Sequence, residues 1–147
     1  MKKTIITVGI AILAIISQNP SKVIAIDNVA GTTPMLSKPL SNEEIVRNLV
    51  EVYSAKYNVS SDKLFDTLKN ENRGFDFDLQ SGLKYKKNNR WGFPEGTREK
   101  SFGVSQIHLP DHPEITYEQA IDPAFSIEYM ASEFSKGRAR QWMGYRG

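Results

Sequence analysis

The sequence predicts an α+β fold that is mainly α and forms a single domain. Three stretches carry apolar residues at helical spacing, and each begins with residue types that cap helices. Only one short stretch, 75–85, alternates apolar and polar residues as a pair of strands does. The chain has 147 residues and no cysteine, so a core without disulfides must stabilise this one domain.

The first 25 residues have the composition of a secretory signal. Met1-Lys2-Lys3 is basic, and Thr4–Ile16 is apolar apart from two threonines. The apolar run is short for a membrane span, which takes about 20 residues. We expect cleavage after Ala25, with Ala30 as the second choice and an uncleaved anchor as the alternative. In each case the domain is expected to be secreted or periplasmic, in the cell envelope.

The segment that follows the signal predicts a flexible linker at 26–40, because it is rich in glycine, threonine, serine and proline. The folded domain is therefore expected at 41–147. Removal of the signal leaves 16 basic and 17 acidic residues, a net charge of about −1. This balance argues against a nucleic-acid partner, which requires a basic surface.

One local basic cluster remains, and we interpret it as a solvated loop or hairpin edge. The alternative interpretation is attraction to an anionic polymer such as the cell wall. A secreted nucleic-acid binder would depend on this cluster alone. Its members are Lys84, Lys86, Lys87 and Arg90.

Two amphipathic helices are predicted at the start of the domain. Ser41 and Glu44 form a capping box for the first, which runs for about four turns. Ser60 or Ser61 caps the second, whose apolar stripe ends at Glu71.

A short β-hairpin is predicted directly after the second helix. Phe75, Phe77 and Leu79 alternate with polar residues, Ser81-Gly82 can turn, and the alternation resumes through Tyr85. Residues 88–96 have the composition of a loop.

Two further helices are predicted near the carboxyl end. Thr116 and Gln119 offer a second capping box for a short helix. Asp122-Pro123 is a cap followed by proline at the first helical position, and Gly137 is a natural stop. The apolar stripe between them is interpreted as core.

Glu71 is the strongest candidate for a chemical role. Leu64, Leu68 and Glu71 share one helical face, and a carboxyl held against an apolar face retains its proton more readily than one in water. Such a glutamate can act as a general acid near neutral pH. The alternative is an ordinary surface glutamate at a helix end.

Two motifs together resemble the soluble lytic transglycosylase family, which has an SLT domain, a lysozyme-like fold and a relationship to goose-type lysozyme. They are Lys69-Asn70-Glu71-Asn72-Arg73-Gly74-Phe75 and Ser101-Phe102-Gly103-Val104-Ser105-Gln106-Ile107. The resemblance covers roughly Ser41 to Tyr145. It implies a lysozyme-like α+β domain with a small β-hairpin next to the catalytic helix.

The resemblance also implies an exported enzyme that cleaves the β-1,4 bond between MurNAc and GlcNAc in peptidoglycan. Glu71 would act first as acid and then as base, giving 1,6-anhydro products without a metal or cofactor. Four other residues match family positions that bind the substrate: Ser101, Gly103, Gln106 and Tyr145. The chain departs from the family pattern where Asn72 replaces the usual serine and Arg146 the usual asparagine.

Two alternatives stay open for the function. A muramidase-type hydrolase would use water and a second carboxylate, for which Asp76 and Asp78 are the nearest candidates in sequence. Their alternation with phenylalanines favours a solvent-facing position. A catalytically inactive, lysozyme-like module that binds the cell wall is the other alternative.

Two further features of the sequence are weaker indications of function. His108 and His112 have the i, i+4 spacing of metal ligands, but Pro110 between them argues against a zinc helix. Trp91 and Phe93 could stack on sugar rings or fold back as a satellite core.

Overall fold

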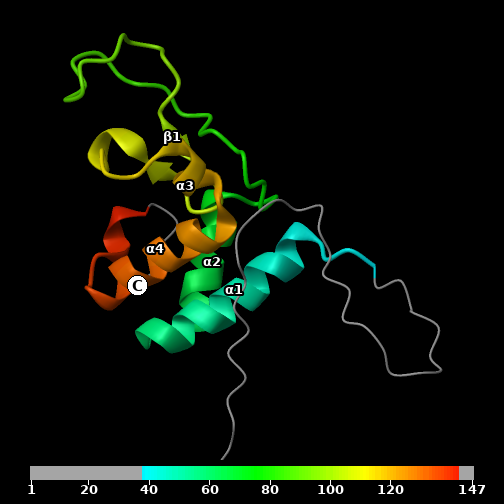
Figure 1. The fold of residues 1–147 in the computed structure, drawn as a ribbon. Helices are drawn as coiled ribbons and strands as arrows, with labels where there is room; N and C mark the ends of the chain where they lie inside the picture. The colour runs from blue at the N-terminus through cyan, green and yellow to red at the C-terminus, as the bar shows by residue number, and fades with distance from the viewer. Residues whose placement is uncertain (1–37, 143–147) are drawn as a thin grey trace, which may run out of the picture. The chain divides into compact units, whose positions relative to one another are not determined.

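The computed structural model describes residues 38–142, which form a small α-rich domain with a short antiparallel sheet (Figure 1). The predicted signal at 1–25 and most of the predicted linker at 26–40 lie outside this range. None of the described helices has both the length and the apolar character needed to cross a bilayer. In chain order the elements are α1 Asn42–Tyr57, α2 Ser61–Glu71, β1 Ser101–Phe102, β2 Ile107–His108, the 3₁₀ helix η1 Leu109–Asp111, α3 Tyr117–Ile121, α4 Pro123–Ser135 and the 3₁₀ helix η2 Ala139–Gln141.

The predicted helix starts are confirmed, because local hydrogen bonds to exposed backbone N–H groups determine them. Ser41 and Glu44 form the complete capping box of α1, and Ser60 accepts a hydrogen bond from the third residue of α2. Thr116 forms a second capping box at α3. Asp122 caps α4, with proline at the first helical position.

The main core lies between α1, α2 and α4, where α1 contacts both other helices. The apolar stripes of all three helices meet there, so the periodicity in the sequence correctly assigned their inner faces. Its fully buried members include Val46, Val50, Leu64, Leu68, Ile127 and Met130.

The predicted hairpin at 75–85 is wrong in its pairing. The chain turns sharply after α2, so Phe75 is buried and has a φ of 48°. A regular strand has no residue with such a φ. Residues 80–85 instead pair in antiparallel fashion with 97–102: Gln80 bridges Phe102 and Lys84 bridges Arg98. Pairing between residues 14 and 22 positions apart therefore replaces the predicted local hairpin.

We call residues 81–100 the arm, since in Figure 1 this segment extends away from the helices (green to yellow-green). Its two sides are joined by backbone hydrogen bonds, including Tyr85 N–H to Thr97 O at 2.8 Å. Tyr85 is buried, stacks on Phe93 at a centroid distance of 4.8 Å and contacts Trp91 at 5.5 Å. The arm thus has its own aromatic cluster, as one of the two alternatives for Trp91 and Phe93 expected.

Candidate active site

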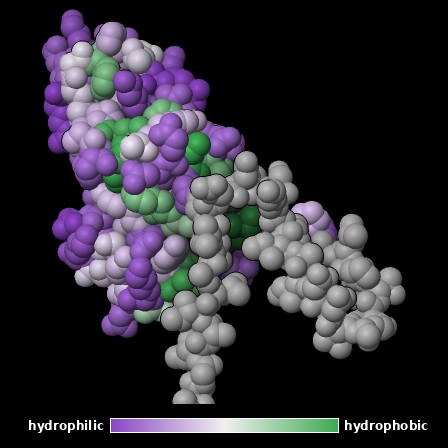
Figure 2. All heavy atoms as spheres, in the orientation of Figure 1, coloured by the Kyte–Doolittle hydropathy of each residue, from purple (hydrophilic) through white to green (hydrophobic). Residues whose placement is uncertain are grey.

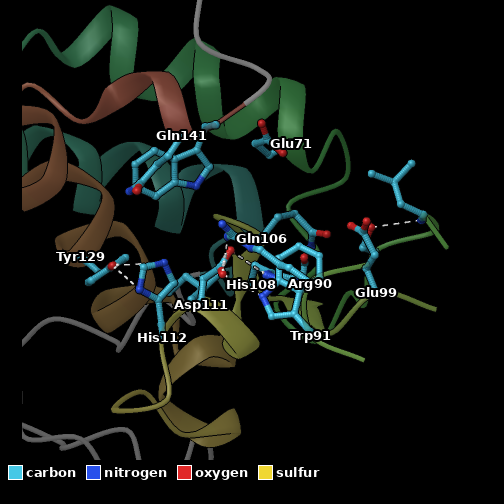
Figure 3. Close-up of a pocket in the computed structure, with 15 residues that line it drawn as sticks. Glu71, Arg90, Trp91, Glu99, Gln106, His108, Asp111, His112, Tyr129 and Gln141 are labelled. Atoms are coloured by element: carbon cyan, nitrogen blue, oxygen red, sulfur yellow. Dashed lines mark hydrogen bonds and ion pairs between the residues drawn. The ribbon is translucent and has the colours of Figure 1, made fainter. Parts of the chain in front are cut away.

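A cavity of about 580 Å³ lies where α2, the arm, the β1–β2 hairpin, η1, α4 and η2 converge. In Figure 3, Glu71 and Gln141 lie on one side of it, and Arg90, Trp91 and His108 lie on the other. Its polar lining residues are Glu71, Ser81, Arg90, Glu99, Ser101, Gln106, His108, Asp111, His112, Tyr129 and Gln141.

Glu71 is half-buried and is the last residue of α2, so the helix end delivers its carboxyl group to the cavity wall. The next residue, Asn72, is buried and ties down the chain at this point. Its amide donates hydrogen bonds to Asp76 O at 2.6 Å and Gly103 O at 3.5 Å, and its Oδ1 accepts one from Asp76 N–H at 3.1 Å. Asn72 therefore links the residue after Glu71 to the loop that follows β1.

Ser101 and Gln106 line the same cavity as Glu71, although they are separated from it by 30 and 35 positions. Ser101 is buried in β1, and its carbonyl accepts a hydrogen bond from Ser81 N–H at 2.9 Å. Gln106 has a φ of 50°, and its Nε2 donates to Leu79 O and Gly103 O at 3.1 and 2.8 Å. The donor end of Gln106 thus holds its own loop, and its Oε1 is the atom left to meet a ligand.

Gly103 does not line the cavity. A Cβ at this position would stand 1.9 Å from the carbonyl oxygen of Ala120, and the φ of Gly103 is 78°. The close backbone approach at Gly103 is therefore made to Ala120 of α3. Tyr145, the fourth predicted binding residue, lies outside the described residues.

A hydrogen-bonded network on the arm side of the cavity centres on Asp111. Its Oδ1 accepts from Trp91 Nε1 at 2.8 Å and from the Arg90 guanidinium at 2.5 Å, and its Oδ2 bonds to His108 Nδ1 at 3.0 Å. Burial favours a higher pKa for Asp111, but the hydrogen bonds from Trp91 and His108 and the charge of Arg90 together lower it. Asp111 is therefore ionised at neutral pH and fastens the arm to η1.

His108 has both ring nitrogens occupied within the protein. Nδ1 faces Asp111, and Nε2 lies 3.0 Å from the hydroxyl of Tyr85, which also accepts from Lys100 N–H at 3.2 Å. A neutral imidazole with its proton on Nδ1 satisfies every one of these bonds, an assignment made from the network. His108 is thus placed to hold the wall of the cavity.

The opposite end of the cavity carries a tyrosine–histidine pair. Tyr129 on α4 lies 2.9 Å from His112 Nδ1, and Glu114 lies 3.6 Å from the same nitrogen. Burial, followed by the negative charges of Glu133 and Glu114, raises the pKa of Tyr129 to about 12. Tyr129 therefore remains a neutral hydroxyl at physiological pH.

The cavity contains two carboxylates besides Glu71, and the sequence interpretation missed both. Asp76 and Asp78 are exposed, as predicted, and do not line it. Glu99 and Asp111 do. The pairing of the two sides of the arm brings Glu99 to the cavity, and no pattern in the sequence around Glu99 indicates this position. For Asp111, the i, i+3 spacing from His108 is a sequence pattern that indicates contact between the two side chains.

Within residues 38–142 no group of three histidines, cysteines or carboxylates is arranged to hold a metal ion. His108 and His112, the pair with metal-ligand spacing, face different hydrogen-bond partners, Tyr85 and Asp111 for the first and Tyr129 for the second.

Comparison of the chain with protein-family models, with curated proteins and with solved structures found no match.

Proposed function

We propose that this protein is an exported, lysozyme-like enzyme that cleaves the β-1,4 bond between MurNAc and GlcNAc in peptidoglycan. One observation carries the proposal: Glu71, Ser101 and Gln106 line a single cavity. The family resemblance implies a role for each of these three residues, which belong to two motifs about 30 positions apart. A cavity of about 580 Å³ has the size of a ligand site.

The proposed mechanism uses the carboxyl group of Glu71 twice. It first donates its proton to the glycosidic oxygen, so that the C1–O bond breaks and GlcNAc leaves as an alcohol. The resulting carboxylate then takes a proton from the 6-hydroxyl of MurNAc, whose oxygen bonds to C1 and closes the 1,6-anhydro ring. Proton transfer by one positioned group typically contributes a rate factor of about 10² to 10⁴.

A muramidase-type hydrolase is the second candidate, and Glu99 favours it. Hydrolysis with inversion needs a carboxylate that activates water across the sugar ring, and Glu99 lines the cavity with Glu71. Asp111 is less suited to that role because three donors already occupy it. A wall-binding module without turnover would use the same cavity and would not depend on the carboxyl group of Glu71.

Mass spectrometry of the fragments released from purified peptidoglycan tests the proposal. A transglycosylase releases 1,6-anhydro products about 18 Da lighter than hydrolysis products, because no water is added. Glu71→Gln should lose activity by about 10² or more while remaining folded by circular dichroism. Glu51→Gln, on the exposed face of α1, is the matched control and should retain full activity.

Reducing-end products, together with loss of activity in Glu99→Gln, would establish the hydrolase instead. Wall binding without any release of fragments would identify the binding module.

A further inference from the structure

The charges of the described domain are strongly segregated. The arm, residues 81–100, carries six lysines and arginines and two glutamates, a net of +4, whereas the remaining described residues carry a net of −5. In Figure 2 most of the visible surface of the arm is hydrophilic, with some apolar residues among the polar ones. A domain that is nearly neutral overall thus presents one basic projection.

Two of the six cations are committed to the protein itself. Arg90 pairs with Asp111 at 2.5 Å. Arg98 donates to Ser81 O at 3.0 Å and Gln80 O at 2.6 Å, which fastens the base of the arm.

The other four cations are lysines with exposed side chains. No ion pair within residues 38–142 involves Lys84, Lys86, Lys87 or Lys100. Lys84 and Lys86 are two positions apart on an extended segment, so they project from the same face about 7 Å apart. Exposed lysines without an ion pair are suited to a polymer with regularly repeated negative charges.

The aromatic residues of the arm exclude one class of polyanion. Binding of single-stranded nucleic acid requires open aromatic faces on which bases stack. Phe93 is stacked by Tyr85 at 4.8 Å and covered by Lys100 at 4.5 Å, while the Arg90 guanidinium lies 4.7 Å over Trp91. These rings make their stacking and cation–π contacts within the arm, which favours recognition of a polyanion by charge over recognition by base stacking.

The position of the arm relates this charge to the cavity. Leu83, Arg90, Trp91 and Glu99 belong to the arm and also line the cavity. A glycan strand in the cavity would therefore contact the same arm that carries the exposed lysines.

We propose that the arm binds a polyol-phosphate polymer attached to the glycan, and so docks the enzyme on phosphate-bearing cell wall. This inference rests on the proposed function for the choice of polymer. The phosphodiester oxygens of the polymer contact four lysines of the arm: Lys84, Lys86, Lys87 and Lys100. Such contacts do not distinguish one nucleic-acid base or sequence from another.

The experiment measures the anisotropy of fluorescein-labelled poly(glycerol phosphate) bound to the full chain across a sodium chloride series. Release of counterions by four lysines gives a slope of log K against log salt of about −3, by analogy with about −0.7 per contact for single strands. The triple variant Lys84→Gln, Lys86→Gln, Lys87→Gln should reduce the slope to about −1. It should weaken binding at low salt on the order of 100-fold, at about fivefold per lysine.

The matched control removes three exposed cations elsewhere: Lys38→Gln, Lys69→Gln, Arg140→Gln. It should bind as the parent does. An equal loss in the control, a missing salt dependence, or tighter binding of oligo(dT) than of poly(glycerol phosphate) would overturn the proposal.

A second measurement separates this inference from the proposed function. Fragment release from peptidoglycan stripped of its phosphate polymer should be equal for the parent and the arm variant, because the three lysines do not line the cavity. Release from unstripped wall should fall in the arm variant alone. Poly(glycerol phosphate) binding without any fragment release would refute the enzyme and leave the docking arm standing.

Discussion

At the scale of single residues, Gly103 shows how one position controls the placement of the site. Its backbone lies against the carbonyl of Ala120 on α3, and its own carbonyl accepts hydrogen bonds from both Asn72 and Gln106. Asn72 follows Glu71 directly, and Gln106 lines the cavity. Gly103 therefore connects Gln106 to the residue that follows Glu71.

We predict that Gly103→Ala destabilises the fold by about 3 kcal/mol or more. The new methyl group would overlap the Ala120 carbonyl oxygen at 1.9 Å, and alanine is disfavoured at a φ of 78°. Urea unfolding measures this loss. Gly82→Ala is the matched control, since nothing lies within 4 Å of a Cβ there. Equal stabilities of the two variants would contradict the packing of the loop against α3.

At the scale of elements, the carboxylate of Asp111 fastens the arm to η1, together with a backbone hydrogen bond from Leu109 N–H to Lys100 O at 2.9 Å. Asp111 accepts from Arg90 and Trp91 on the arm and bonds to His108 at the end of β2. The arm provides part of the cavity wall, so Asp111 positions that wall by holding the arm in place.

We predict that Asp111→Ala raises the KM for wall fragments about tenfold and changes kcat much less. Loss of hydrogen bonds to a charged group costs about 1.5 kcal/mol or more, and here the cost is in the positioning of the arm. The indole of Trp91 should become wetter, which a red shift of tryptophan emission would report. As a control, Asp111→Ala made in a Trp91→Phe background should leave the tryptophan emission unaltered. A loss of kcat without a change in KM would instead indicate a catalytic role for Asp111.

A second junction joins α4 to η2, which contributes Gln141 to the cavity. Glu133 is 4% exposed and is bound by Arg138 through both carboxylate oxygens and by Lys136 at 3.0 Å. The hydrogen bond from Arg138 is the main cause that lowers the pKa of Glu133, and Lys136 adds to it. This turn after α4 is therefore held by charge as well as by packing.

At the scale of the whole molecule, several carboxylates have a pKa that the folded state lowers. The pKa of Glu128 is lowered, chiefly by the hydrogen bond from Lys56, and the pKa of Asp111 is lowered as described above. For each group the folded pKa lies below the unfolded one, so the folded state is favoured fully above the ordinary carboxyl range. That stabilisation is lost as pH falls through the folded values.

We predict that the free energy of unfolding declines as pH falls below about 4, the ordinary carboxyl range, and that Glu133→Gln makes this decline shallower. The variant should also lose about 1 to 2 kcal/mol at neutral pH, a modest amount because both cationic partners are about half exposed. Urea titrations at a series of pH values measure both effects. Glu118→Gln, an exposed residue of α3, is the control and should follow the parent curve.

The sequence by itself determined the parts of this protein that depend on neighbours along the chain. Helix starts follow from side chains that bond to N–H groups three positions away, and inner helix faces follow from the 3.6-residue period. For these reasons α1, α2, α3 and α4 were predicted where the structure has them. Glu71 was placed at the end of α2 on the same grounds.

Only the tertiary structure decided how distant segments pair and what gathers around Glu71. The alternation at 75–85 is compatible with several partners, and pairing with 97–102 prevailed because it encloses Tyr85 in the aromatic cluster of the arm. The same pairing carries Glu99 into the cavity, and the backbone fit against Ala120 gives Gly103 its role. The pairing of the arm, the position of Glu99 and the role of Gly103 depend on contacts between residues far apart in the sequence. Local sequence patterns do not predict such contacts.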